Sequence, residues 1–297
     1  MHKNSVLFYT QNRWAFGQIH HSLIKRLWSH GIYAHLLDWT QSYSQLEFDL
    51  LNKKFETFVT TPEAVEHLKQ RGIPLSRIVS IAHHEKDITS AVTDYGVSNF
   101  EELKGYGVIN NSLIDVSKKL GIKRIPFTLK VGIDFDHFYL PVNKTLEVIG
   151  YAGEIKSSMS DGSDFKRSYL IPSIIDRVKL PLRSHEFFNH LCMSGYYTLI
   201  DALLVSSNYE TAGLPAMEAA AAGKLVISPA VGYFDGSFGV LCRTPDQEFL
   251  EDAVETIERF KDPVLYKNIC LSSQQCIKDH FDWSVLIKDW INIIYNP

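Results

Sequence analysis

The sequence predicts an α/β fold in which helices cover parallel sheets on both faces. Short apolar runs of strand length, such as residues 6–9 and 57–60, alternate along the chain with amphipathic helical segments. The 297 residues are 45% hydrophobic and 22% charged, which is typical of a soluble globular protein and sufficient for two domains of ordinary size.

The helix expected at residues 18–30 illustrates how the elements are assigned. Its apolar residues recur at helical spacing, at Ile19, Leu23, Ile24 and Leu27, and Gly31 ends it. The other elements expected in the first half are strands at 6–9, 33–37, 57–60, 77–82 and 106–109, a polar loop at 10–17, and helices at 64–71 and up to Leu120.

A linker divides the chain near residues 140–146, because the segment from Pro141 to Thr145 is polar and begins with proline. We therefore expect an N-terminal domain at 1–143, a C-terminal domain at 144–280 and a final helix within 281–297. The elements expected after the linker are strands at 147–153, 199–205, 225–227 and 239–241, a polar loop at 157–163, and helices at 165–178, around 218 and at 246–260.

Residues 206–232 are the most informative stretch. Glu210 and Glu218 stand eight positions apart, separated by a turn of small residues, and four alanines follow Glu218. The strand before this turn delivers Glu210 to the sheet edge where open α/β sheets bind ligands. The amides of Gly213 and Leu214 should lie at a helix N-terminus, which favours an anionic group. Two carboxylates for hydroxyl groups and an amide-lined turn for a diphosphate predict a nucleotide-sugar site.

Each glutamate also has a simpler interpretation. Glu210 could only stabilise the dipole of the following helix, and Glu218 could be a solvated helix residue. The four alanines argue against the second interpretation, because they are typical of a closely packed helix with little surface.

The segment resembles the Glu-x7-Glu signature of the retaining glycosyltransferases of family 4, which have the GT-B fold. The resemblance continues through the apolar run 239–241, the acidic helix 246–260 and Phe281-Asp-Trp283. It implies two Rossmann-like domains that face each other across a cleft, with the final helix crossing back to the N-terminal domain. The C-terminal domain would bind a nucleoside-diphosphate sugar and the N-terminal domain the acceptor.

The resemblance also implies roles for residues of the C-terminal domain. Glu210 should contact hydroxyls of the donor sugar and Glu218 the nucleotide ribose. Glu154 stands where family members usually carry arginine, so Lys166 or Arg167, and next Lys156, are the candidates to neutralise the diphosphate. The remaining donor-binding candidates are Thr211, Ala212, Gly213 and Leu214.

In the N-terminal domain, His83 and His84 follow an apolar strand. By resemblance, one histidine here should face the reaction centre, and we favour His83 for this role. His84 is an acceptor-side candidate, and a loop histidine with no role is the simpler interpretation. The loop 11–17 corresponds to a glycine-rich loop in the family, which makes Arg13, Trp14 and Gly17 acceptor-side candidates. Trp14 could stack on a sugar ring or simply pack.

Several classes of partner are not expected. The four cysteines form no Cys-x-x-Cys pair, and His20-His21 lack a carboxylate at zinc-site spacing, so we expect no metal and no cofactor. The net charge of −4 gives no indication of nucleic-acid binding. The absence of a long apolar run or a signal peptide suggests a cytoplasmic protein, with peripheral membrane contact open through Lys25-Arg26 and Lys53-Lys54.

The expected activity is metal-independent transfer of a sugar from a nucleoside diphosphate to a hydroxyl of a glycan or lipid-linked acceptor, with retention of configuration. Two alternatives stay open: a nucleotide-sugar 2-epimerase, and a non-catalytic carbohydrate- or nucleotide-sugar-binding protein of the same fold. The sequence leaves the sugar, the base, the acceptor and the oligomeric state open.

Overall fold

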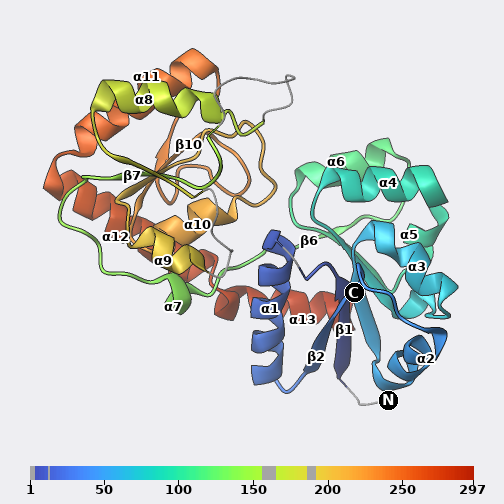
Figure 1. The fold of residues 1–297 in the computed structure, drawn as a ribbon. Helices are drawn as coiled ribbons and strands as arrows, with labels where there is room; N and C mark the ends of the chain where they lie inside the picture. The colour runs from blue at the N-terminus through green and yellow to red at the C-terminus, as the bar shows by residue number, and fades with distance from the viewer. Residues whose placement is uncertain (1–3, 13, 156–164, 186–191) are drawn as a thin grey trace. The chain divides into compact units, whose positions relative to one another are not determined.

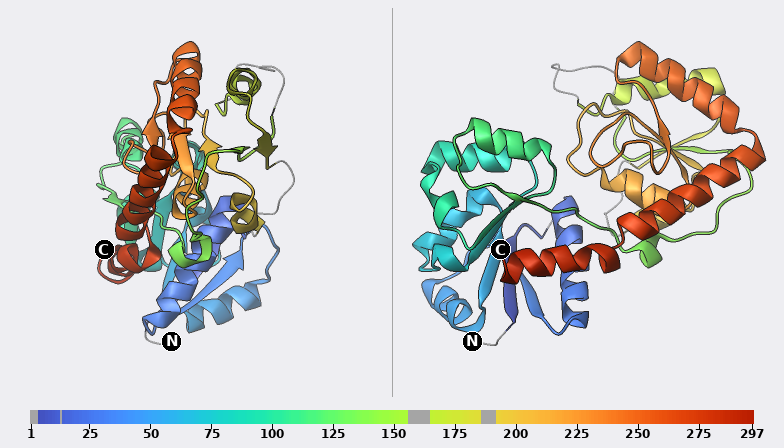
Figure 2. Two further views of the ribbon diagram at one scale, coloured as in Figure 1. Left: turned by 90° about the vertical axis from the view of Figure 1, so that its left-hand side faces the viewer. Right: turned by 180° about the vertical axis from the view of Figure 1, so that it is seen from behind.

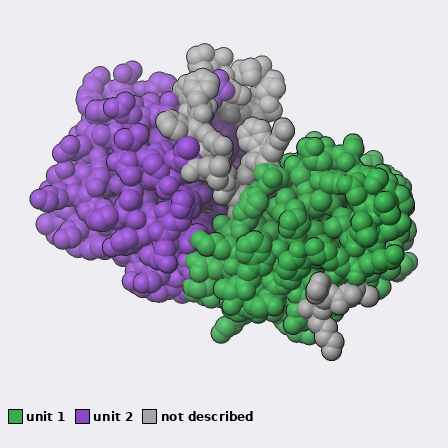
Figure 3. Space-filling view, turned by 60° about the horizontal axis from the view of Figure 1, so that its bottom comes forward, with its two compact units in different colours: residues 1–132, 283–297 green, residues 133–282 purple. Residues whose placement is uncertain are grey.

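The computed structural model describes residues 4–12, 14–155, 165–185 and 192–297. The chain divides into two compact units, coloured separately in Figure 3. Unit 1 consists of Met1–Gly132 and Trp283–Pro297, and unit 2 of Ile133–Asp282.

The first division lies earlier than the linker that composition indicates at 143/144, and the second lies at 282/283 rather than 280/281. Two contacts explain this. Ile133 forms a parallel bridge with Asp282, and the Asp282 carboxylate accepts a hydrogen bond from the Phe135 amide at 2.9 Å. The two segments in which the chain passes between the units, at 132/133 and 282/283, are thereby hydrogen-bonded to each other.

Unit 1 contains a six-stranded parallel sheet of order β2-β1-β3-β4-β5-β6 (Figure 1). Its strands are β1 (Ser5–Thr10), β2 (Tyr33–Asp38), β3 (Thr57–Thr60), β4 (Ile78–Ala82), β5 (Gly105–Val108) and β6 (Phe127–Thr128). Its helices are α1 (Trp14–Ser29), α2 (Gln45–Lys54), α3 (Val65–Gln70), α4 (Glu85–Tyr95), α5 (Ser98–Glu102), α6 (Ser112–Lys119) and α13 (Trp283–Tyr295), with 3-10 turns η1 (Pro62–Ala64) and η2 (Leu75–Arg77).

The last helix of the chain, α13, completes unit 1. It packs against α1, β3 and β5, and Figure 2 shows it from behind alongside the strands of unit 1. Gly105 and Gly107 permit this approach, since a Cβ at Gly107 would lie 2.8 Å from the Ile293 side chain and one at Gly105 2.9 Å from Pro297.

Unit 2 contains a five-stranded parallel sheet of order β11-β10-β9-β7-β8. Its strands are β7 (Ile149–Tyr151), β8 (Leu182–Ser184), β9 (Ala202–Leu204), β10 (Leu225–Ser228) and β11 (Val240–Leu241). Its helices are α7 (Phe135–Phe138), α8 (Ile171–Val178), α9 (Met193–Tyr197), α10 (Leu214–Ala221), α11 (Asp246–Phe260) and α12 (Pro263–His280), with the 3-10 turn η3 (Ser168–Leu170). Helices α8 and α11 lie on one face of this sheet and α10 on the other (Figure 1).

The α/β class and the two parallel sheets are confirmed, and α11 has the bounds that the sequence predicts. One element differs near the N-terminus: α1 begins at Trp14, so Gly17 lies in a helix and not in a loop. A Cβ at Gly17 would lie 2.4 Å from the Asn12 carbonyl oxygen, so glycine allows the helix to begin this close to the preceding turn. Among the described residues, no helix is long and apolar enough to cross a bilayer.

Helix α10 is closely packed, as the alanines predict. Ala219 to Ala222 are fully buried, and α10 lies against β9, β10 and α12. The Gln274 side chain of α12 donates to the Ala221 carbonyl at 2.9 Å and to the Leu140 carbonyl at 2.7 Å. It thereby satisfies a carbonyl group in the last turn of α10, where helices lack internal partners.

Candidate functional site

The carboxyl end of β9 leads through buried Ser206 and Ser207 into the turn that starts α10. Gly213 caps the helix in the left-handed conformation, with φ of 77°. A second loop packs on this turn: the Tyr233 amide donates to the Ala212 carbonyl at 3.1 Å, and a Cβ at Gly232 would lie 2.6 Å from that same oxygen. Glycine at 232 therefore lets two loops meet closely at this edge of the sheet.

Glu210 and Lys166 form an ion pair in this turn. The Lys166 ammonium group contacts Glu210 Oε1, and the Ser207 hydroxyl donates to the same oxygen at 2.9 Å. The Glu210 side chain is 18% exposed and that of Lys166 44% exposed, so the pair is open to solvent on the lysine side. The structure thus brings together two residues that are 44 positions apart.

The ion pair lines a recess with a volume of about 330 Å³, which includes the part of the recess that is open to solvent. Gly213, Pro215 and Ala216 contribute the start of α10, and Tyr151 and Ala152 contribute the end of β7. All of the lining residues belong to unit 2. The recess therefore combines a cation, a carboxylate and a helix N-terminus at the carboxyl ends of two adjacent strands.

The N–H groups at the start of α10 lack protein acceptors among the residues that the structure describes. Within the described part of the chain, the N–H groups of Gly213 and Leu214 have no hydrogen-bond acceptor. Such amides at a helix N-terminus favour an anionic group. Of the neighbouring donor-binding candidates, Thr211 is half-buried and Ala212 is buried.

Glu218 lies inside α10 and is 3% exposed. It accepts a hydrogen bond of 2.9 Å from the hydroxyl of Tyr197, itself fully buried on α9. Burial raises the pKa of Glu218 to about 7, and the Tyr197 hydrogen bond opposes this rise. Glu218 is not among the residues that line the recess, so the two glutamates of the motif have different environments.

Arg167 lies next to Lys166 in the sequence but has a different environment. It is 4% exposed, and its guanidinium group donates to the Ser206 carbonyl at 2.6 Å, to the Thr244 carbonyl and to Asp246 at 2.9 Å. It also lies over the ring of Phe249. Arg167 does not line the recess, whereas Lys166 does.

In unit 1, His83 and His84 follow β4 as expected. His83 is buried, and its ring lies 5.6 Å from that of His20. Burial, with a smaller contribution from His20, holds the pKa of His83 well below its usual value. His84 caps α4, where its Nδ1 accepts a hydrogen bond from the Lys86 amide at 3.0 Å. Asp87 completes the cap by accepting from the amides of both histidines.

Two of the other acceptor-side candidates, Trp14 and Gly17, lie at the start of α1. Gly17 is buried in the first turns of α1, and Trp14 is the first residue of that helix. Arg13 lies outside the described residues, as does Lys156, the third candidate for a cation.

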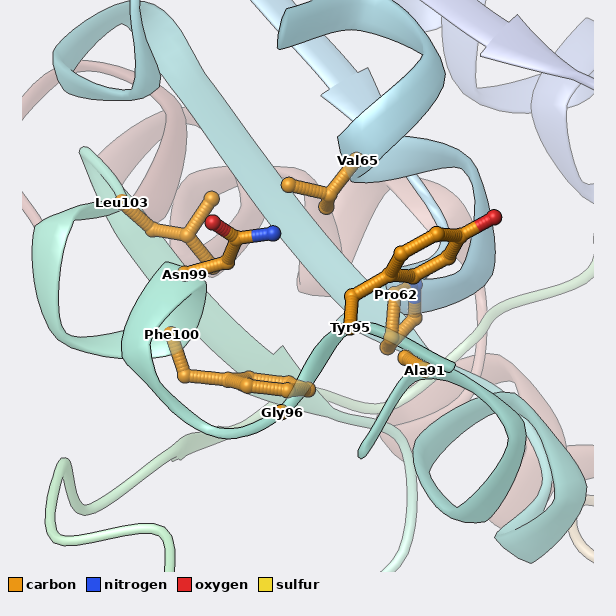
Figure 4. A pocket seen from close by; sticks show the side chains of 8 residues that line it. All are labelled: Pro62, Val65, Ala91, Tyr95, Gly96, Asn99, Phe100 and Leu103. Atoms are coloured by element: carbon orange, nitrogen blue, oxygen red, sulfur yellow. The ribbon is translucent and has the colours of Figure 1, made fainter. Parts of the chain in front are cut away.

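A separate pocket lies in unit 1, between η1, α4 and α5 (Figure 4). Its lining is almost entirely apolar and contains none of the residues that the sequence singles out: Pro62, Val65, Ala91, Tyr95, Gly96, Asn99, Phe100 and Leu103. It offers no cation for a diphosphate.

Among the described residues, no three histidine, cysteine or acidic side chains are grouped so that they could hold a metal ion.

No family model matches the chain. A stretch of 113 residues is 31% identical to the glycogen synthase of Mycobacterium tuberculosis, and this match covers 35% of the present chain and 27% of that enzyme.

Two solved structures share the whole fold. HepE from Anabaena, in complex with UDP-glucose, has a TM-score of 0.64 at 14% identity, over 97% of this chain and 98% of that one. An α-glucosyltransferase in complex with UDP-glucose and DNA containing an abasic site has a TM-score of 0.70 at 10% identity, over 98% and 99%. The chain therefore has the two-sheet α/β fold of GT-B glycosyltransferases.

Proposed function

We propose that the chain is a metal-independent retaining glycosyltransferase of the family 4 type. It would move a sugar from a nucleoside diphosphate to a hydroxyl of a glycan or lipid-linked acceptor. The observation that carries the proposal is the Lys166–Glu210 ion pair, which lines a recess beside the N-terminus of α10. A cation, an acceptor of hydroxyl hydrogen bonds and two available amides suit a sugar linked to a diphosphate.

The ion pair suggests how the donor would bind. A diphosphate that enters the recess competes with Glu210 for the Lys166 ammonium group. The carboxylate, still bonded to Ser207, is then free to accept hydrogen bonds from the sugar hydroxyls. Glu218 would hold the ribose after a small rearrangement, since its present partner is Tyr197.

In the proposed reaction the acceptor oxygen bonds to the anomeric carbon as the bond to the diphosphate oxygen breaks. The acceptor proton passes to the leaving phosphate on the same face of the sugar, which gives retention. No protein nucleophile is needed, and the protein contributes orientation and charge stabilisation. We assign His83 to the reaction centre, and His84, Gly17, Trp14 and Arg13 to the acceptor side.

The activity is tested with a panel of UDP-, ADP- and GDP-sugars, by measuring release of nucleoside diphosphate with and without acceptor. Because one structural neighbour is complexed with DNA, the acceptors include DNA as well as glycans and lipid-linked saccharides. Activity should survive EDTA, and strict dependence on Mn²⁺ would contradict the mechanism. Conversion of the sugar without diphosphate release would instead indicate an epimerase, and binding without either reaction a non-catalytic protein.

Lys166→Ala and Glu210→Gln should each lower kcat/KM by about 10²–10³-fold. The first removes the cation that stabilises the leaving diphosphate, and the second removes the charged acceptor that orients the donor sugar. The matched control is the surface ion pair Lys261–Glu258 in the same unit, with N–O distance 2.6 Å. Lys261→Ala and Glu258→Gln should keep wild-type kinetics. Full activity of the Glu210 variant would refute the assignment of the site.

A further inference from the structure

Arg167 has a backbone conformation that is unusual for its residue type. Its φ is 49° and its ψ 38°, in the left-handed region. Among the described residues, only Asn4, Arg167 and Lys179 share a positive φ without being glycine. A residue with a Cβ is less stable than glycine in this conformation, and contacts of its side chain can offset that cost.

The guanidinium group of Arg167 makes such contacts. It joins three separate parts of unit 2: the end of β9 through the Ser206 carbonyl, the segment before α11 through the Thr244 carbonyl, and α11 itself through Asp246. Asp246 is fixed in turn by the Tyr169 hydroxyl, which donates to its other oxygen at 2.5 Å. A planar guanidinium group spreads its donors over three nitrogens in fixed directions and so reaches separated acceptors, whereas an ammonium group has all three donors on one nitrogen.

Two further hydrogen bonds hold the backbone around Lys166 against the segment that Arg167 contacts. The Ser206 hydroxyl donates to the Lys166 carbonyl at 2.6 Å, and the Asn208 amide donates to the Phe165 carbonyl at 2.8 Å. Residues 165–167 are therefore attached to residues 206–208, a segment that ends two residues before Glu210. Lys166 consequently reaches Glu210 from a backbone that is held on both sides.

We infer that Arg167 is a positioning residue, which sets the Lys166 ammonium group opposite Glu210 and does not itself contact the donor. The inference rests on the proposed function, because it takes Lys166 as the group that meets the diphosphate. It replaces the expectation that Arg167 binds the donor directly, which its burial and its three protein acceptors do not favour.

The first test compares two glycine variants. Arg167→Gly suits the left-handed backbone but removes the guanidinium group. Lys179→Gly is the matched control, because Lys179 is an exposed residue of the same unit with φ of 57°. Arg167→Gly should lower kcat/KM for the donor at least tenfold, and Lys179→Gly should leave it unchanged.

A double-mutant cycle separates positioning from direct contact. If Arg167 acts through Lys166, then Arg167→Gly in the Lys166→Ala background should lower kcat/KM by less than twofold further. Losses that multiply independently would overturn the inference, because Arg167 would then act on the donor on its own.

A second readout does not depend on turnover. The rate of reductive methylation of Lys166, followed by mass spectrometry, should rise several-fold in Arg167→Gly. Lys261 is the internal reference, since it is 40% exposed and paired with a glutamate, much like Lys166. An unchanged Lys166 rate in a folded variant would overturn the positioning role.

If Arg167→Gly does not fold, Arg167→Lys replaces it in both tests, because this variant keeps the charge and loses the multiple contacts.

The transferase activity and the positioning role of Arg167 fail in different ways. A protein that turns over no donor, yet shows the methylation difference, would refute the transferase activity and retain the positioning role.

Discussion

Glu218 combines a carboxyl group with an almost completely buried position on α10. Its pKa of about 7 lies above the ordinary value of 4.5 because the protein interior disfavours the charged form. The folded state therefore binds a proton between these two pH values, and the unfolded state does not. Stability should accordingly fall as pH rises from about 4.5 to 7, and then level off, a loss of about 3 kcal/mol.

Glu218→Gln should remove this pH dependence, since the amide is neutral and its oxygen can still accept from Tyr197. The variant should match the wild type near pH 4.5 and exceed it by about 3 kcal/mol at pH 8, as measured by urea unfolding. Its nucleotide affinity should fall, because a carboxylate is the better acceptor for a ribose diol. Glu255→Gln, at an exposed position of α11, should keep the wild-type slope. Parallel curves for Glu218→Gln and the wild type would contradict this interpretation.

The residues of the candidate site could be predicted from the sequence only in part. Glu210, Gly213 and Glu218 occur in one local motif, whose spacing indicates a turn and a helix. The partners that set their chemistry are distant in sequence: Lys166 is 44 residues from Glu210, and Tyr197 is 21 from Glu218. No periodicity relates such positions, so the roles of Tyr197 and Arg167 emerge only from the fold.

At the scale of elements, α4 begins with an uncommon cap. Asp87 Oδ2 accepts from the amides of His83 at 2.8 Å and His84 at 2.9 Å, and the side chain is buried. These bonds orient the residues that follow β4, including His83. A histidine N-cap is not one of the usual signals for a helix start, which explains why the sequence did not predict α4.

Asp87→Ala should destabilise the protein by about 2–3 kcal/mol, because it leaves two amides without their charged acceptor. Asp87→Asn should cost less, since one oxygen remains. His84→Ala removes a single, exposed cap bond and should cost about 0.5–1 kcal/mol. Chemical unfolding at pH 7 ranks the three variants, and an Asp87→Ala loss no larger than that of His84→Ala would contradict the role of the aspartate.

Other helices begin with signals in the sequence that apolar periodicity does not capture. Helix α2 begins with a capping box in which Ser44 and Glu47 satisfy each other's amides. Helix α12 begins with Asp262 as its cap and Pro263 at its first position, a recognised start signal. The strands at 57–60 and 225–227 were predictable because they are fully buried and apolar or β-branched throughout.

At the scale of the whole molecule, the chain leaves unit 1 after Gly132 and returns to it at Trp283. Helix α13 contributes large apolar side chains to the core of unit 1: Trp283, Trp290 and Ile294 are fully buried. The Trp290 indole donates to the Lys130 carbonyl at 2.8 Å, close to the point where the chain leaves the unit. Unit 1 therefore depends on residues from both ends of the sequence, and unit 2 on one continuous segment.

Truncation after Asp282 should consequently unfold unit 1 and spare unit 2. Loss of a buried tryptophan typically costs 3–5 kcal/mol, and two are removed here, against a total stability of about 5–15 kcal/mol for an ordinary domain. The glycines of β5 would add to the loss, because no side chain of their own replaces the contact with α13. Hydrogen exchange followed by mass spectrometry should show protection lost in β1, β3 and β5 and retained in β7, β9 and β10. Trp290→Phe, which keeps an aromatic ring but lacks the indole donor, should weaken protection in unit 1 without abolishing it. Equal loss of protection in both units would show that they fold as a single cooperative body, and protection retained in both would show that α13 contributes little to unit 1.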